Sequence, residues 1–89
     1  MLIRSQNKEV LVAFENLLNI EVSSGGVIST RVDNGWSCLL GEYSTKAKAM
    51  KVLDMIQEAY ERYEYEKAFK TGLALFEAFQ MPEDGSVEA

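Results

Sequence analysis

The side chains that most often carry out chemistry in proteins are scarce in this chain. Its 89 residues include no histidine and one cysteine, Cys38. Without histidine no Ser-His or Cys-His nucleophile pair can form, and the commonest general base and zinc ligand are missing. Gly25-Gly26 opens an expected strand rather than a helix, so it does not fit a phosphate-binding loop. We therefore expect no enzyme activity, no cofactor, no metal and no small-molecule substrate.

Carboxylates recur along a helix that we expect from residue 44 to residue 72. Glu58, Glu61 and Glu64 follow one another at intervals of three residues, which places them on one side of a helix. Paired carboxylates act as acid and base only in a cleft that separates their pKa values. These three fall away from the apolar stripe of the helix, so we interpret them as a solvated surface.

Three lysines near the start of the same helix form the first candidate contact site. Lys46, Lys48 and Lys51 stand where acidic residues are usually preferred, because the helix dipole is positive there. Together with Ser44, Thr45 and the free N–H groups of the first turn, they could hold a phosphate or a partner's carboxylate. The alternative is an ordinary exposed turn.

A candidate interface combines aromatic and apolar residues. Trp36, Cys38 and Leu40 alternate along an expected strand, on the face that we assign away from the core. Such a strand face is typical both of a core and of an interface. If residues 73–81 do not cover it, we expect a second copy of the chain to do so. In this setting Cys38 is a small apolar residue rather than a nucleophile.

The expected secondary structure changes from strands to a helix at residues 41–45. Before this point apolar and polar residues alternate, which predicts strands near residues 2–5, 10–14, 18–22, 27–32 and 36–40. Asn34-Gly35 predicts a two-residue hairpin turn, because a type I′ turn needs positive φ at both central positions.

The turns predict a register for the last three strands. The expected pairs are Leu18–Val32, Ile20–Thr30, Val22–Ile28, Asp33–Trp36, Val32–Ser37, Thr30–Leu39 and Ile28–Gly41. One face then forms the core and includes Leu39, while the other carries Trp36, Cys38 and Leu40. A slip of one residue would exchange the two faces.

After residue 45 the chain changes to helical periodicity. Apolar residues recur at intervals of three and four and form one stripe: Ala49, Val52, Leu53, Ile56, Ala59, Tyr60 and Tyr63. Ser44 or Thr45 is the expected cap and Gly72 the expected stop. Residues 73–81 fit either a closing strand or a short second helix.

These elements define an α+β fold, in which an antiparallel β-meander of four to five strands is covered by one long C-terminal helix. We expect a single domain over residues 1–82 and a flexible acidic tail over residues 83–89. The first residues show neither a signal peptide nor a membrane span, and a lone cysteine suits a reducing compartment, so a cytoplasmic location is expected.

Three stretches resemble small, functionally uncharacterised proteins of Gram-positive bacteria and their phages. They are Ile3-Arg4-Ser5-Gln6, Leu40-Gly41-Glu42-Tyr43-Ser44-Thr45 with the apolar positions that follow it, and Phe79-Gln80-Met81-Pro82-Glu83-Asp84. The resemblance spans nearly the whole chain. It implies a cytoplasmic protein, with a prophage as one source, and favours a closing strand at residues 74–81. It transfers no catalytic or binding residue.

The function expected from the sequence is that of a non-enzymatic interaction or accessory module that self-associates as a dimer or binds a protein partner. The alternative is a nucleic-acid-related regulator, or an acidic mimic of DNA that acts on a DNA-processing protein. The net charge of −5 disfavours direct contact with nucleic acid, which needs clustered Lys and Arg. Mimicry is disfavoured because basic residues interrupt the carboxylates of the helix.

Overall fold

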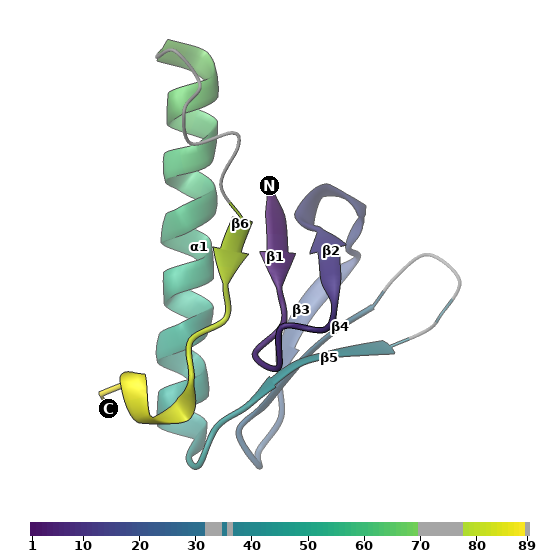
Figure 1. Ribbon diagram of the computed structural model, residues 1–89, viewed down its shortest axis with the longest axis vertical. Coiled ribbons are helices and arrows are strands. Elements are labelled where there is room, and N and C mark those ends of the chain that lie inside the picture. The colour runs from purple at the N-terminus through teal and green to yellow at the C-terminus, as the bar shows by residue number, and fades with distance from the viewer. Residues whose placement is uncertain (32–34, 36, 70–77, 89) are drawn as a thin grey trace.

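The computed structural model describes residues 1–31, 35, 37–69 and 78–88. Within these residues the chain is α+β, with one long helix placed beside two three-stranded sheets (Figure 1). The first sheet has the order β2-β1-β6, with β1 at Leu2–Arg4, β2 at Leu11–Ala13 and β6 at Ala78–Gln80. The second has the order β3-β4-β5, with β3 at Asn19–Val22, β4 at Val27–Arg31 and β5 at Ser37–Glu42. The helix α1 spans Lys46–Phe69, and two short 3-10 turns are η1 at Phe14–Asn16 and η3 at Asp84–Ser86.

The predicted α+β class with a long helix after the strands is confirmed, but the single antiparallel meander is wrong. The turn η1 follows β2 directly and ends its pairing, so that β3 starts a separate sheet. The ambiguous segment contains a strand at residues 78–80, and this strand runs parallel to β1. A parallel neighbour needs a crossover connection, which α1 supplies. Residues 73–77 lie outside the described part of the chain.

The second sheet confirms three of the expected pairs and contradicts two. Across β3 and β4, Ile20 pairs with Thr30 and Val22 with Ile28, as predicted. Ile28 also pairs with Gly41, but Thr30 pairs with Cys38 rather than with Leu39, because a bulge follows Ile28. Ser37 pairs with Arg31 rather than with Val32. The predicted pairs Leu18–Val32 and Asp33–Trp36 fall outside the described residues.

The bulge exchanges the faces of β5. Leu40 is the extra residue and lies in the core with 1% of its surface exposed, whereas Leu39 is 50% exposed. The prediction that placed Leu39 inside and Leu40 outside is therefore wrong. Leu18, also expected in the core, is 62% exposed.

The helix begins where the sequence predicts. The backbone N–H of Lys48 donates to the hydroxyl oxygen of Thr45 at 3.1 Å, so Thr45 is the N-cap. The predicted stripe faces the sheets, with Ala49, Val52 and Ile56 buried. The described helix ends at Phe69, and the stop predicted at Gly72 lies beyond the described residues.

One core joins the two sheets and the helix. Ile3 of β1, Ile28 of β4 and Ile56 of α1 are almost completely buried within it. The other buried apolar residues are Met1, Leu40, Tyr43, Ala49, Val52, Met81 and Val87. The buried polar groups Ser5 and Thr30 are hydrogen-bonded, since the Ser5 hydroxyl donates to Asn7 and the Thr30 hydroxyl donates to the carbonyl of Asn19.

The acidic C-terminal segment packs against the start of α1 instead of extending into solvent (Figure 1). Val87 is only 5% exposed and belongs to the core. We expected a flexible tail from residue 83, but residues 83–88 are packed against the rest of the chain. Val87 packs in the core, and the Asp84 carboxylate accepts a hydrogen bond from the Ser44 backbone.

Candidate protein-interaction surface

The interface predicted at Trp36, Cys38 and Leu40 does not form an exposed patch. Leu40 lies in the core. Cys38 is half-buried and faces the same side of the sheet as Thr30, its buried cross-strand partner. Trp36 lies outside the described residues. The bulge that buries Leu40 is the physical reason for this correction.

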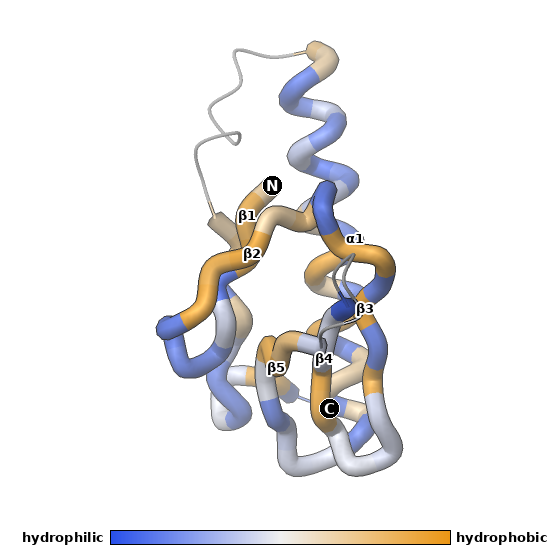
Figure 2. Tube along the Cα trace, turned by 90° about the vertical axis from the view of Figure 1, so that its right-hand side faces the viewer, coloured by the Kyte–Doolittle hydropathy of each residue, from blue (hydrophilic) through white to orange (hydrophobic). Residues whose placement is uncertain are grey.

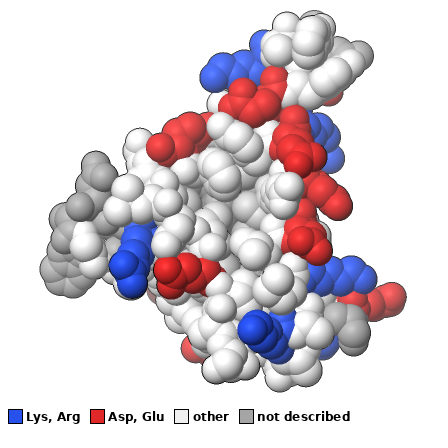
Figure 3. Space-filling view, turned by 180° about the vertical axis from the view of Figure 1, so that it is seen from behind, with Lys and Arg blue, Asp and Glu red and all other residues white. Residues whose placement is uncertain are grey.

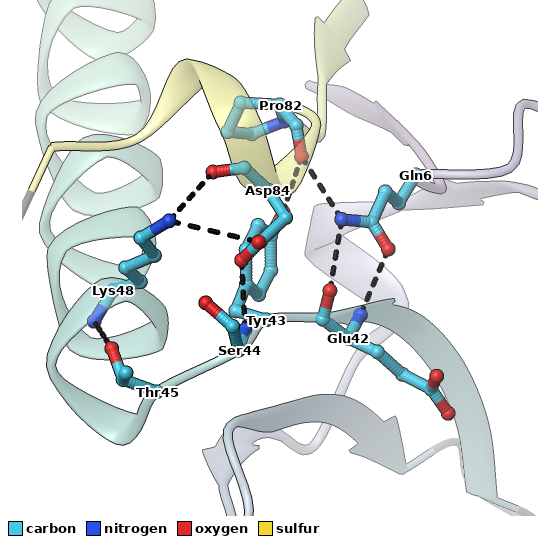
Figure 4. Close-up of polar contacts among 8 residues, drawn as sticks. All are labelled: Gln6, Glu42, Tyr43, Ser44, Thr45, Lys48, Pro82 and Asp84. Atoms are coloured by element: carbon cyan, nitrogen blue, oxygen red, sulfur yellow. Dashed lines mark hydrogen bonds and ion pairs between the residues drawn. The ribbon is translucent and has the colours of Figure 1, made fainter.

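The predicted anion site at the start of α1 is occupied by the chain's own carboxylate (Figure 4). The backbone N–H of Ser44 donates to Oδ1 of Asp84 at 2.7 Å. The ammonium of Lys48 lies 3.6 Å from Oδ2 of Asp84 and donates to the Asp84 carbonyl at 3.2 Å. Two of the five residues predicted to hold an acidic group, Ser44 and Lys48, therefore contact a carboxylate of the same chain.

The other two lysines of this cluster have different surroundings. Lys51 donates to the backbone carbonyl of Glu88 at 2.6 Å, which also holds the C-terminal segment. Lys46 is exposed and makes no such contact among the residues that the structure describes. We therefore do not propose this cluster as a site for an external anion.

Replacing Asp84 by asparagine is expected to destabilise the fold in a pH-dependent way. The hydrogen bond from the Ser44 backbone, aided by Lys48, holds the pKa of Asp84 below its ordinary value of 3.8. A carboxyl group with a lowered pKa stabilises the folded chain above its unfolded pKa and loses that contribution as the pH falls through its folded pKa. In urea titrations the gap between wild type and Asp84→Asn should be widest at neutral pH and close in acid. A gap of constant size down to pH of about 2 would show that the charge plays no part.

A polar network fixes the same corner of the molecule. The side-chain amide of Gln6 donates to the carbonyls of Glu42 and Pro82, and its oxygen accepts the backbone N–H of Glu42 (Figure 4). The Tyr43 hydroxyl donates to Pro82 at 2.7 Å, and burial, followed by the charge of Asp84, raises its pKa to about 12. The three stretches that carry the resemblance thus lie together. Because these groups bind one another, the network positions the chain rather than a ligand.

A groove lined mostly by apolar residues lies away from this network. It has a volume of about 590 Å³ and lies between η1, the start of β3 and the middle of α1. Figure 3 shows this face as an uncharged hollow bordered mainly by acidic side chains, with basic side chains at its lower left and below it. The residues that line it are Phe14, Leu17, Leu18, Asn19, Ile20, Leu53, Ile56, Gln57, Tyr60 and Glu61.

Aromatic stacking fixes one wall of the groove. The rings of Phe14 and Tyr60 stack with their centroids 4.2 Å apart and an angle of 23° between the ring planes. A hydrogen bond to the Glu64 carboxylate, aided by burial, raises the pKa of Tyr60 to about 12. Tyr60 therefore remains neutral and keeps the Glu64 carboxylate beside the groove.

The rim of the groove is acidic and exposes one large apolar side chain. Glu61 lines the groove, Glu64 hydrogen-bonds to Tyr60, and Glu21 accepts a hydrogen bond from the lining residue Asn19. Within the described residues none of these carboxylates forms an ion pair. Leu18 is 62% exposed at this rim. The sequence pattern does not indicate this surface, because the alternation of apolar residues places Leu18 on the core face.

The described residues contain no cluster of three or more His, Cys, Asp or Glu residues that could hold a metal ion. None of the described helices is long and apolar enough to cross a membrane.

Comparison with protein-family models, with curated proteins and with solved structures found no match to this chain. The resemblance to small proteins of Gram-positive bacteria and their phages therefore stays a prediction.

Proposed function

We propose that the protein is a non-enzymatic interaction module that self-associates through the face containing the groove. The single observation that supports this proposal is the apolar groove with Leu18 exposed at its rim. Contiguous apolar surface of this kind on a small protein commonly marks a binding site for another macromolecule. The proposal keeps the self-association expected from the sequence and moves it to a different face.

A second copy is a suitable occupant because a two-fold interface uses the same patch on both subunits. The groove-bearing face contains both a hollow and a protruding apolar side chain, Leu18. Each copy can therefore place its Leu18 against the groove of the other. This arrangement would remove Leu18 from water in both copies, which favours association by roughly 1.5–3 kcal/mol for each side chain.

Replacing Leu18 by aspartate is expected to abolish self-association without unfolding the chain. The side chain is exposed, so the charge costs little in the monomer, whereas burial in an interface would be strongly unfavourable. The matched control is Leu11→Asp, because Leu11 is 55% exposed and lies on β2 of the other sheet. Light scattering on a sizing column should give twice the chain mass for wild type and for Leu11→Asp, and the chain mass for Leu18→Asp.

Two results would overturn the proposal. One is a wild-type protein that keeps the mass of a single chain at every concentration. The other is equal loss of association in both variants while their circular dichroism spectra stay unchanged, which would exclude the groove-bearing face as the specific interface.

A further inference from the structure

The strand β3 is an edge strand whose outer side is free in the described part of the chain. Its only sheet neighbour is β4, and Figure 2 shows β3 on the outside of the sheet, with β4 between it and β5. Such an edge is a template for pairing with another chain. The start of this strand also lines the groove.

The hydrogen bonds indicate which backbone groups face outward. The carbonyl of Asn19 accepts the Thr30 hydroxyl, and the N–H of Ser23 donates to the carbonyl of Val27, so both groups point toward β4. In an antiparallel ladder the residues alternate between those bonded to the neighbour and those turned away from it. The N–H and C=O groups of Ile20 and Val22 therefore face the open edge.

We propose that the groove is closed by β3 of a second copy, which adds antiparallel to this edge with Ile20 opposite Ile20 of the partner subunit. The inference rests on the proposed function and specifies its geometry. The two sheets would join into one sheet of six strands, and each groove would receive apolar side chains from the partner subunit. This is the strand-addition mode of recognition, in which backbone bonds provide affinity and side chains provide specificity.

The chemistry of residues 18–22 selects this register. Pairing centred on Ile20 places Leu18 opposite Val22 and Asn19 opposite Glu21, so that the side chains of all five residues have a partner. The N–H of Leu18 donates to the carbonyl of Arg31 in its own chain, so the backbone bonds between the two copies would come from Ile20 and Val22. Pairing centred on Glu21 would put two like charges directly opposite each other, which is destabilising. Pairing centred on Asn19 would leave Val22 beyond the end of the partner strand.

The distribution of charge along α1 supports a second copy as the occupant. A two-fold axis perpendicular to the sheet makes the two helices run antiparallel on one face. The helix begins with Lys46, Lys48 and Lys51 and has no acidic residue in its first turn. Its second half carries Glu58, Glu61, Glu64 and Glu66 against Arg62 and Lys67, which leaves a net charge of −2. Lys48 and Lys51 are held by the C-terminal segment of their own chain, so Lys46 is the cation of each helix start that would approach the acidic half of the other helix, which is a complementary arrangement.

Disulfide trapping tests the register. In a Cys38→Ser background, the double variant Asn19→Cys/Glu21→Cys should form a covalent dimer under mild oxidation, because directly opposite residues meet disulfide geometry. Each single variant should stay monomeric on a non-reducing gel, since its cysteine would face the native residue. The variant Ile20→Cys should also be trapped, because position 20 pairs with itself.

The outcomes separate this inference from the proposed function. A covalent dimer from Glu21→Cys alone, or from Asn19→Cys alone, would overturn the register. A dimer seen by light scattering but trapped by none of the variants would overturn strand addition while leaving self-association intact. Absence of any dimer by light scattering would overturn the proposed function itself.

Discussion

Replacing Leu40 by alanine is expected to lower the free energy of unfolding by about 2–5 kcal/mol, the usual cost of truncating a buried leucine. Leu40 is 1% exposed, and it packs in the core that contains Ile28 and Ile56. The alanine variant would lose this apolar burial and leave a cavity that the surrounding strands and helix fill only in part.

The neighbouring residue provides the matched control. Leu39 is 50% exposed, so Leu39→Ala is expected to change stability by no more than about 0.5 kcal/mol. Urea denaturation of both variants, analysed with a common slope, measures the two effects. The opposite order of effects would mean that β5 pairs without the bulge and that Leu39 faces the core, as the turn alone predicts.

Replacing Gly26 by alanine is expected to destabilise the fold by about 2–5 kcal/mol, combining backbone strain with overpacking. Gly26 has a φ of +83°, which disfavours any residue with a Cβ. A Cβ there would also lie 2.5 Å from the carbonyl oxygen of Tyr43 and 3.0 Å from that of Thr45. These are backbone atoms, which cannot rotate away as a side chain would.

Gly35 provides a control that separates the cost of backbone strain from the cost of overpacking. It has the same φ of +83°, but a Cβ there would meet no atom of the described residues within 4 Å. Gly35→Ala is therefore expected to cost only the backbone term, about 1–2 kcal/mol. Thermal unfolding followed by circular dichroism measures both variants. Equal losses of stability would indicate that the close approach of residues 43–45 to Gly26 contributes nothing.

The close packing at Gly26 also explains how the strands position the helix. The N–H of Tyr43 donates to the carbonyl of Gly26 at 2.9 Å, just before the N-cap of α1. The turn between β3 and β4 thus fixes the direction in which α1 leaves β5. The groove lies between β3 and α1, so Gly26 acts on its shape without lining it.

Much of the local structure follows from sequence patterns. The change of period near residue 45 predicts where the strands end and the helix begins, and Thr45 caps the helix as expected. The apolar stripe at three- and four-residue spacing faces the core. Ile20 and Val22 pair with Thr30 and Ile28 as the loop at residues 24–26 predicts.

Longer-range features do not follow from the sequence patterns. A bulge after Ile28 shifts one strand by a residue and buries Leu40 in place of Leu39. The turn signal at Asn34-Gly35 contains no information about this bulge, since the extra residue, Leu40, is buried in a core that joins both sheets and the helix. The predicted interface depended on that register and was lost with it.

The sequence by itself determined the class of fold, the start of the helix, the pairing of β3 with β4, and the scarcity of catalytic side chains, because each of these depends on residue types and on neighbours close in the chain. Only the tertiary structure decided that the strands form two sheets, that Asp84 occupies the start of α1, and that Leu18 and Tyr60 belong to one groove. The physical reason is that these features join residues far apart in the chain, and their positions depend on how the core packs rather than on local preference.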